Sequence, residues 1–144
     1  MEFELTAVAG DGLVLEVPAA FFSYEANDRL ERLGSTDGNV YYQFWRLRHH
    51  VGVYLQKGSG LIFAGASLDN LVFANSSLQH FNECVQWIAD RSLFYIEESE
   101  IEECEMAAES LEEIVRGVDP PAIAEGTFWS DFISDVSIGD YPGN

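Results

Sequence analysis

The sequence predicts an α+β fold, in which a largely antiparallel β-sheet packs against three or four α-helices. Three observations support this prediction. Short runs of aromatic and β-branched residues, separated by turn residues, fill the first half of the chain and are typical of strands. After Ala74 the apolar residues change to helical spacing. Strands that are followed by helices, rather than alternating with them, indicate an α+β domain.

An N-terminal β-hairpin is predicted from residues 2–9 and 12–17, where apolar and acidic positions alternate. The two runs flank Gly10-Asp11-Gly12, which can supply the positive φ angles of a tight turn. Pro18 then interrupts the alternation.

One short helix is predicted between Pro18 and Gly34. The apolar residues of this stretch recur near helical spacing, and they are Phe21, Phe22, Ala26, Leu30 and Leu33. Gly34 is suited to ending a helix.

A meander of four short strands is predicted from Val40 to Ala74. Its runs are YYQFWRL, VGVYLQ, LIFAGA and LVFA. Turns at His49-His50, Gly58-Ser59-Gly60 and Asp69-Asn70 separate them, and Asp37-Gly38 precedes the first. Because these connections are short, we expect successive strands to pair antiparallel.

Three helices are predicted in the second half. The first has Ser76 and Gln79 as a capping box and buries Leu78, Phe81, Val85 and Ile88. The second begins at Ser99 with Glu102, buries Ile101, Cys104, Ala108, Leu111 and Val115, and ends near Gly117, before Pro120-Pro121. The third follows Thr127 and buries Phe128 or Trp129 with Phe132 and Val136.

Length and composition favour a single compact domain over residues 1–144, with a frayed tail at about 139–144. The chain has 7 basic and 25 acidic residues, a formal net charge of -18. Nucleic acids and anionic membranes attract clustered lysine and arginine, so neither is expected as a direct partner. The N-terminus has no basic region followed by an apolar run, and we expect a cytoplasmic protein whose Cys84 and Cys104 are reduced.

No catalytic, metal or cofactor site is predicted. His49, His50 and His80 are the three histidines, and none lies in the sequence context of an activated nucleophile. His80 falls on the polar side of its helix and is expected at the surface. No zinc, calcium-loop or phosphate-loop spacing occurs in the chain.

The most acidic stretch runs from Glu97 to Glu113, with nine carboxylates and no lysine or arginine. A helix rises about 1.5 Å per residue, which spreads these groups along a surface instead of gathering them around one ion. The residues expected to meet a basic partner are Glu98, Glu102, Glu105, Glu109, Glu112 and Glu113. A solvated helix face without a partner is the alternative interpretation.

The meander is rich in aromatic residues, and Tyr41 and Tyr54 are candidate anchors for a partner. Tyrosine is favoured at interfaces because it combines a large apolar area with a polar group. The alternative is that most of these aromatic side chains belong to the core.

Two motifs resemble a known family. NSSLQHF, from Asn75 to Phe81, is similar to the strand-to-helix junction of the SUKH superfamily, particularly its fourth subfamily. DPPAIAEGTFWSDFI, from Asp119 to Ile133, resembles that subfamily's ending, in which Asp-Pro precedes a terminal helix with a tryptophan. With the meander, the resemblance covers roughly residues 35–140. Asn75 and Ser76 match the motif, and we assign them to helix capping.

The resemblance implies an immunity protein of polymorphic toxin systems, which is not an enzyme and binds a cognate toxin. The resemblance also implies that the toxin is a nuclease or a nucleic-acid deaminase. The acidic composition agrees, because such toxins need cationic clefts, and we expect a basic, folded toxin domain that is blocked by occlusion. Two alternatives remain: an acidic secretion chaperone that binds an effector segment, and a small enzyme or ligand-binding domain. The sequence does not decide between a monomer and a dimer.

Overall fold

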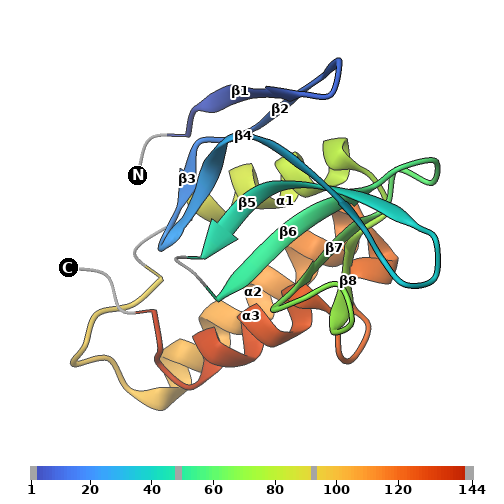
Figure 1. The fold of residues 1–144 in the computed structure, drawn as a ribbon. Helices are drawn as coiled ribbons and strands as arrows, with labels where there is room; N and C mark the ends of the chain where they lie inside the picture. The colour runs from blue at the N-terminus through green and yellow to red at the C-terminus, as the bar shows by residue number, and fades with distance from the viewer. Residues whose placement is uncertain (1–2, 48–49, 92–93, 142–144) are drawn as a thin grey trace.

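The computed structural model describes residues 3–47, 50–91 and 94–141, and it has an α+β fold (Figure 1). The strands are β1 (Leu5–Gly10), β2 (Leu13–Pro18), β3 (Ala20–Phe21), β4 (Tyr24–Gly34), β5 (Val40–Leu47), β6 (Val51–Gln56), β7 (Ile62–Gly65) and β8 (Leu71–Asn75). The helices are α1 (Leu78–Ala89), α2 (Ile101–Val118), the 3-10 helix η1 (Pro120–Ile123) and α3 (Phe128–Ser137). The predicted fold class is confirmed.

The strands form a two-stranded hairpin, β1-β2, and a six-stranded antiparallel sheet in which β3 to β8 pair in chain order. The sheet is curled, and α2 and α3 lie side by side below it while the hairpin lies above it (Figure 1). Aromatic side chains fill the core between the sheet and the helices. The ring centroid of Phe81 on α1 lies 5.0 Å from that of Trp45 and 6.2 Å from that of Trp129.

The N-terminal hairpin forms as predicted. Asp11 and Gly12 have φ angles of 55° and 76°, which suit the tight turn that joins two twisted strands. The hairpin packs closely on β4, because a Cβ atom added at Gly10 would lie 2.8 Å from the carbonyl oxygen of Leu30. Glycine is therefore required at position 10 for this close approach.

The stretch where one short helix was predicted, between Pro18 and Gly34, forms β3 and β4 instead, and that prediction is wrong. Pairing with β5 explains the difference, since Tyr24 aligns with Leu47 and Leu33 aligns with Tyr41. The register shifts between Ala26 and Glu31, so the apolar residues do not follow strict alternation. Their spacing of three or four arises from this irregular strand.

The meander is confirmed, and each pair of neighbours from β5 to β8 is antiparallel. The register of β5 against β6 shifts between Gln43 and Trp45. This irregularity accompanies the burial of the consecutive residues Phe44 and Trp45, which a regular strand would point to opposite faces. His50 lies in a turn as expected, whereas His49 lies outside the described residues.

All three predicted helices form, but two begin differently. Ser77, not Ser76, caps α1, and its side chain accepts the backbone N–H of His80. Glu100, not Ser99, is the N-cap of α2 and makes no side-chain capping bond. Ser99 instead accepts the backbone N–H of Ile96, at 2.9 Å, because it belongs to the preceding turn. Thr127 caps α3 as predicted.

The end of the chain is packed as far as Tyr141, so this part of the predicted tail is not frayed. The ring centroid of Tyr141 lies 4.6 Å from that of Phe132 and 5.0 Å from that of Phe22. Residues 142–144 lie outside the described residues. Among the helices that the structure describes, none combines the length and the apolar character needed to cross a bilayer.

Candidate functional site

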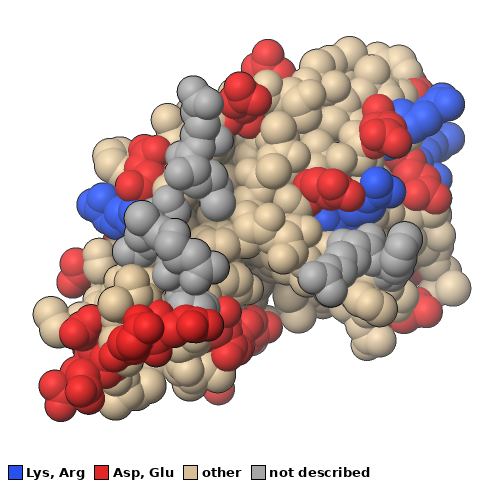
Figure 2. Space-filling model, turned by 90° about the vertical axis from the view of Figure 1, so that its left-hand side faces the viewer, with Lys and Arg blue, Asp and Glu red and all other residues tan. Residues whose placement is uncertain are grey.

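The carboxylates that we predicted as a binding surface lie on and just before α2, and we call them the acidic face. Its members are Glu98, Glu102, Glu105, Glu109, Glu112 and Glu113. The helical period separates them from the buried side of α2, which consists of Cys104, Ala108, Leu111 and Val115. Five members are exposed, and Glu112 is partly buried. Figure 2 shows Asp and Glu gathered along the lower edge of the molecule, where α2 begins.

Two details of α2 differ from the expectation. Ile101, which we predicted on the buried side, is the first residue of the helix and is 53% exposed. It lies with the exposed Ile96 and Ile138 around a shallow groove. Glu112 pairs with Arg116 one turn later, with 3.3 Å between Oε1 and Nη2. The other members of the acidic face have no ion-pair partner in the described part of the chain, so their negative field is not neutralised locally.

Tyr41 and Tyr54 are buried, so the expectation that they are exposed anchors is wrong. Their exposed fractions are 6% and 5%. The two rings meet edge to face with 6.4 Å between their centroids, and the ring centroid of Phe63, on β7 two strands away, lies 6.1 Å from that of Tyr41. Gln56 donates a hydrogen bond to the Tyr41 hydroxyl at 3.2 Å. Packing between strands therefore covers the tyrosine ring surfaces that we expected to be available to a partner.

The two sequence motifs meet in the core through a hydrogen-bonded network. Asn75, at the end of β8, accepts a hydrogen bond from the Trp129 indole N–H at 2.7 Å and donates one to the Asp119 carboxylate at 3.1 Å. Asp119 also accepts the backbone N–H of Ser76 at 2.7 Å and its hydroxyl at 2.8 Å. We call these four residues the motif network; it joins β8, the end of α2 and the start of α3.

The motif network corrects two roles assigned from the sequence. Asn75 and Ser76 bind Asp119 instead of capping α1. His80 lies at the surface as expected, with 39% of its side chain exposed, and its Nδ1 lies 3.9 Å from Asp119 Oδ1. Because Asn75 is completely buried and Asp119 is 2% exposed, neither can touch a partner. This network serves the fold, and sequence reasoning missed it because its members are up to 54 residues apart.

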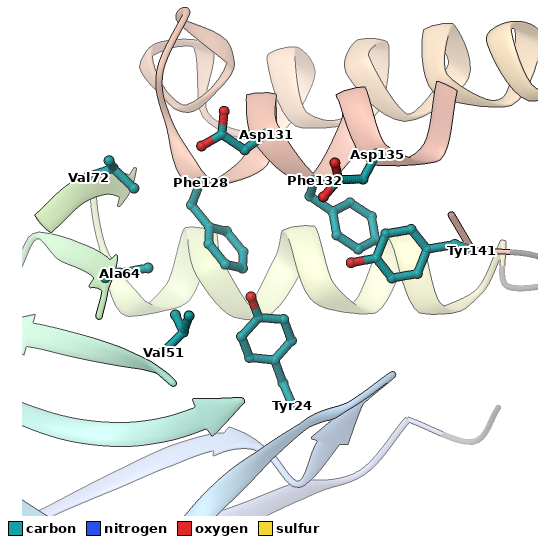
Figure 3. Close-up of a pocket in the computed structure, with 10 residues that line it drawn as sticks. Tyr24, Val51, Ala64, Val72, Phe128, Asp131, Phe132, Asp135 and Tyr141 are labelled. Atoms are coloured by element: carbon teal, nitrogen blue, oxygen red, sulfur yellow. The ribbon is translucent and has the colours of Figure 1, made fainter. Parts of the chain in front are cut away.

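A second candidate site is a cavity of about 220 Å³ between α3 and the sheet (Figure 3). Its lining residues are Tyr24, Val51, Ala64, Gly65, Val72, Phe128, Asp131, Phe132, Asp135 and Tyr141. The sheet contributes the aliphatic wall, and α3 contributes the two carboxylates. The volume is below the roughly 300–1,000 Å³ of sites for small-molecule ligands.

The cavity lining carries carboxylates and phenols but no lysine or arginine. Burial raises the pKa of Asp135, and the nearby charges of Asp140 and Asp131 act in the same direction. Burial also raises the pKa of Tyr24 to about 12, with further contributions from Tyr141 and Asp135. Burial raises the pKa of Tyr141 as well, so both tyrosines are neutral near neutral pH. Among the described residues that line the cavity, the negative charges have no positive counterpart.

We predict that Tyr24 makes the stability of the protein decrease at alkaline pH. Its pKa rises from 10.0 to about 12 on folding, so the folded state favours the neutral phenol. This contribution is complete below pH 10 and is lost as the pH rises from 10 to 12. Urea unfolding across this range measures the loss, and Tyr24→Phe should reduce it. An unchanged alkaline loss in Tyr24→Phe would contradict the assignment.

The described residues contain no group of three or more metal-ligating side chains. Cys84 and Cys104 are free and buried. Burial raises the pKa of the Cys84 thiol to about 12, which makes it a poor nucleophile. The acidic face and the cavity on α3 both carry carboxylates, and both favour a cationic ligand.

Comparison with known proteins gives a family match. A family model described as SUKH-4 immunity protein matches residues 26–135, well over half of the chain. The matched range includes both sequence motifs, the motif network and the acidic face. It also includes eight of the ten residues that line the cavity, since Tyr24 lies just before the range and Tyr141 just after it. No curated protein and no solved structure matches the chain.

Proposed function

The chain belongs to the SUKH-4 immunity protein family, and we propose that it protects against its cognate toxin by direct binding, without catalysing a reaction. Family membership supports an immunity function and a toxin as partner. It also favours this function over that of a secretion chaperone, the alternative that the sequence left open.

The acidic face is the observation that carries the proposal about the toxin. Four exposed carboxylates of the acidic face lie on α2 and a fifth, Glu98, lies just before it, in a protein of formal net charge -18. Proteins that act on nucleic acids use cationic surfaces to neutralise phosphates. A basic nuclease or deaminase domain is therefore the class of toxin that this surface complements, and the cytoplasm is where such a toxin would meet its substrate.

The proposed mechanism is occlusion of the toxin's cationic substrate-binding surface. The acidic face would occupy the positions that nucleic-acid phosphates otherwise take. Its field would also accelerate encounter, because complementary charges can raise association to about 10⁸ M⁻¹s⁻¹ at low salt. The same field is screened over about 8 Å at physiological ionic strength, so association should slow as salt is added.

Co-expression with the toxin encoded beside its gene tests the proposal. The wild-type protein should restore growth, and the purified proteins should form a complex in which nucleic-acid cleavage or deamination is blocked. Absence of both rescue and binding would refute the function. Binding of an extended segment, but not of the folded toxin domain, would support a chaperone instead.

We predict that Glu102→Gln, Glu105→Gln and Glu109→Gln together slow association with the toxin more than they accelerate dissociation. All three carboxylates are exposed and lie on the acidic face. Because exposed charges act mainly through long-range steering, the association rate at low salt should fall by about tenfold. Stopped-flow or surface-plasmon measurements over a range of salt concentrations separate the two rates.

A matched control removes three exposed carboxylates from other parts of the surface: Glu4→Gln, Asp28→Asn and Asp69→Asn. It changes the net charge by the same amount but leaves the acidic face intact. An equal loss of association rate in both triple variants would show that total charge, not α2, steers the toxin. An unchanged rate in the α2 variant would exclude the steering role.

A further inference from the structure

We propose that the cavity between α3 and the sheet binds the guanidinium group of an arginine side chain of the toxin. The inference rests on the proposed function and adds a second contact to it, on α3 instead of α2. Phe128 and Phe132 were predicted from the sequence only as core residues of the last helix, and no residue of this cavity was predicted to bind a ligand. Its chemistry follows from residues that only the fold brings together (Figure 3).

The charge of the cavity favours a cation. Asp131 and Asp135 lie one helical turn apart on α3, so both carboxylates are on the same side of the helix. Neither has an ion-pair partner within residues 3–47, 50–91 and 94–141. Burial raises the pKa of Asp135, and the charges of Asp140 and Asp131 raise it further, so the ionised carboxylate is disfavoured. A bound cation would stabilise the ionised form of the carboxylates.

Aromatic rings provide the remaining walls. Tyr24 and Phe128 meet edge to face with 5.7 Å between ring centroids, and Tyr141 packs against Phe132 at 4.6 Å. Both tyrosine hydroxyls point into the cavity (Figure 3). Ring faces attract cations, and this attraction strengthens where water is partly excluded. The phenol oxygens can also accept hydrogen bonds from a guanidinium group.

The combination of groups favours arginine over lysine. Guanidinium is planar and has five N–H donors, so it can stack on a ring while it donates to more than one acceptor. The residues that line the cavity offer several acceptors: the carboxylates of Asp131 and Asp135 on α3, the hydroxyl group of Tyr24 on β4, and that of Tyr141, which follows α3. Its volume of about 220 Å³ suits a single side chain inserted from a partner surface.

A titration with N-acetyl-L-arginine amide tests the site without the toxin. Binding should shift the NMR signals of residues 128–135, and the neutral isostere N-acetyl-L-citrulline amide should bind at least about tenfold more weakly, because it lacks the charge. Asp131→Asn with Asp135→Asn should weaken arginine binding to the same extent, whereas Glu102→Gln with Glu109→Gln should not. Equal binding of both probes, or no shift at α3, would overturn the proposal.

Measurements with the toxin separate this inference from the proposed function. Asp131→Asn with Asp135→Asn should raise the Kd at least about tenfold, and Tyr24→Phe with Tyr141→Phe should raise it less, because the rings remain. Failure of the wild-type protein to bind refutes the proposed function. Tight wild-type binding that both cavity variants retain refutes only the cavity contact. Thermal melting of each variant checks that the fold is intact.

An arginine of the chain itself is the competing occupant. Arg48 lies outside the described residues, three positions before Val51, which lines the cavity. The probe should bind Arg48→Ala and wild-type protein with equal affinity if the site is open to a partner. Binding that appears only in Arg48→Ala would overturn the proposal and assign the cavity to an intramolecular contact.

Discussion

Trp129→Ala should lower the free energy of unfolding by about 3–5 kcal/mol, the range for removing a buried tryptophan. Trp129 is fully buried between Phe81 of α1, Phe21 of β3 and Phe132 of its own helix. The substitution also leaves the Asn75 side-chain oxygen without its 2.7 Å hydrogen bond in the core. The lost ring contacts and the lost hydrogen bond both weaken the packing of α3 against the sheet.

Urea unfolding followed by far-ultraviolet circular dichroism measures this effect without relying on tryptophan fluorescence. Trp87→Ala is the matched control, because Trp87 lies on α1 and is 50% exposed. This substitution should lower the free energy of unfolding much less than Trp129→Ala does. Trp129→Phe keeps most of the ring volume and provides a measurable variant if Trp129→Ala does not fold. An equal decrease in the free energy of unfolding for Trp87→Ala and Trp129→Ala would contradict the burial of Trp129 in the core.

Asp119→Ala should lower the free energy of unfolding by about 3 kcal/mol, because it leaves one buried and two partly buried donors without their acceptor. Asp119 is 2% exposed and accepts hydrogen bonds from Asn75 and from both the backbone and the hydroxyl of Ser76. The same unfolding measurement applies. Asp69→Ala, which removes an exposed carboxylate, should change stability little.

The Asp119 and Trp129 effects should not be additive, because both residues bind the side chain of Asn75. Combining Asp119→Ala with Trp129→Phe tests this coupling. We expect the double variant to lose less stability than the sum of the two single variants. Strict additivity would indicate that the two hydrogen bonds act independently.

The local sequence pattern was sufficient to predict most of the helices and strands. The turn at Asp11-Gly12 and the short connections of the meander specified antiparallel hairpins. The three helices followed from apolar residues at helical spacing, and the buried side of α2 matched the prediction except at Ile101. These features depend on residues that are close together in the sequence, which is why the periodic spacing of apolar residues predicts them.

The stretch from Pro18 to Gly34 shows where local pattern failed. Its polar residues and the spacing of Phe21, Leu30 and Leu33 are compatible with a helix. Pairing with β5, whose partner residues lie up to 23 positions away in the sequence, stabilises a strand instead. Strand formation depends on such distant partners more than helix formation does.

The candidate sites likewise combine features that the sequence predicted with features that it did not. The exposure of the acidic face could be predicted, because helical spacing determines which side of α2 faces the core. The burial of Tyr41 and Tyr54 could not, because it depends on aromatic residues of neighbouring strands. The cavity was also missed, since β4, β6, β7, β8 and α3 contribute to it from separate parts of the chain.

The sequence by itself determined the α+β class, the antiparallel meander, the three helices and the negative charge of α2, since each depends on composition or on spacing along a short segment. Only the tertiary structure decided that Asn75 and Asp119 join two distant motifs, and that Asp131, Asp135, Tyr24 and Tyr141 share one cavity. Hydrogen bonds and cavities form between residues that meet in space, and their positions in the chain carry no local periodic signal.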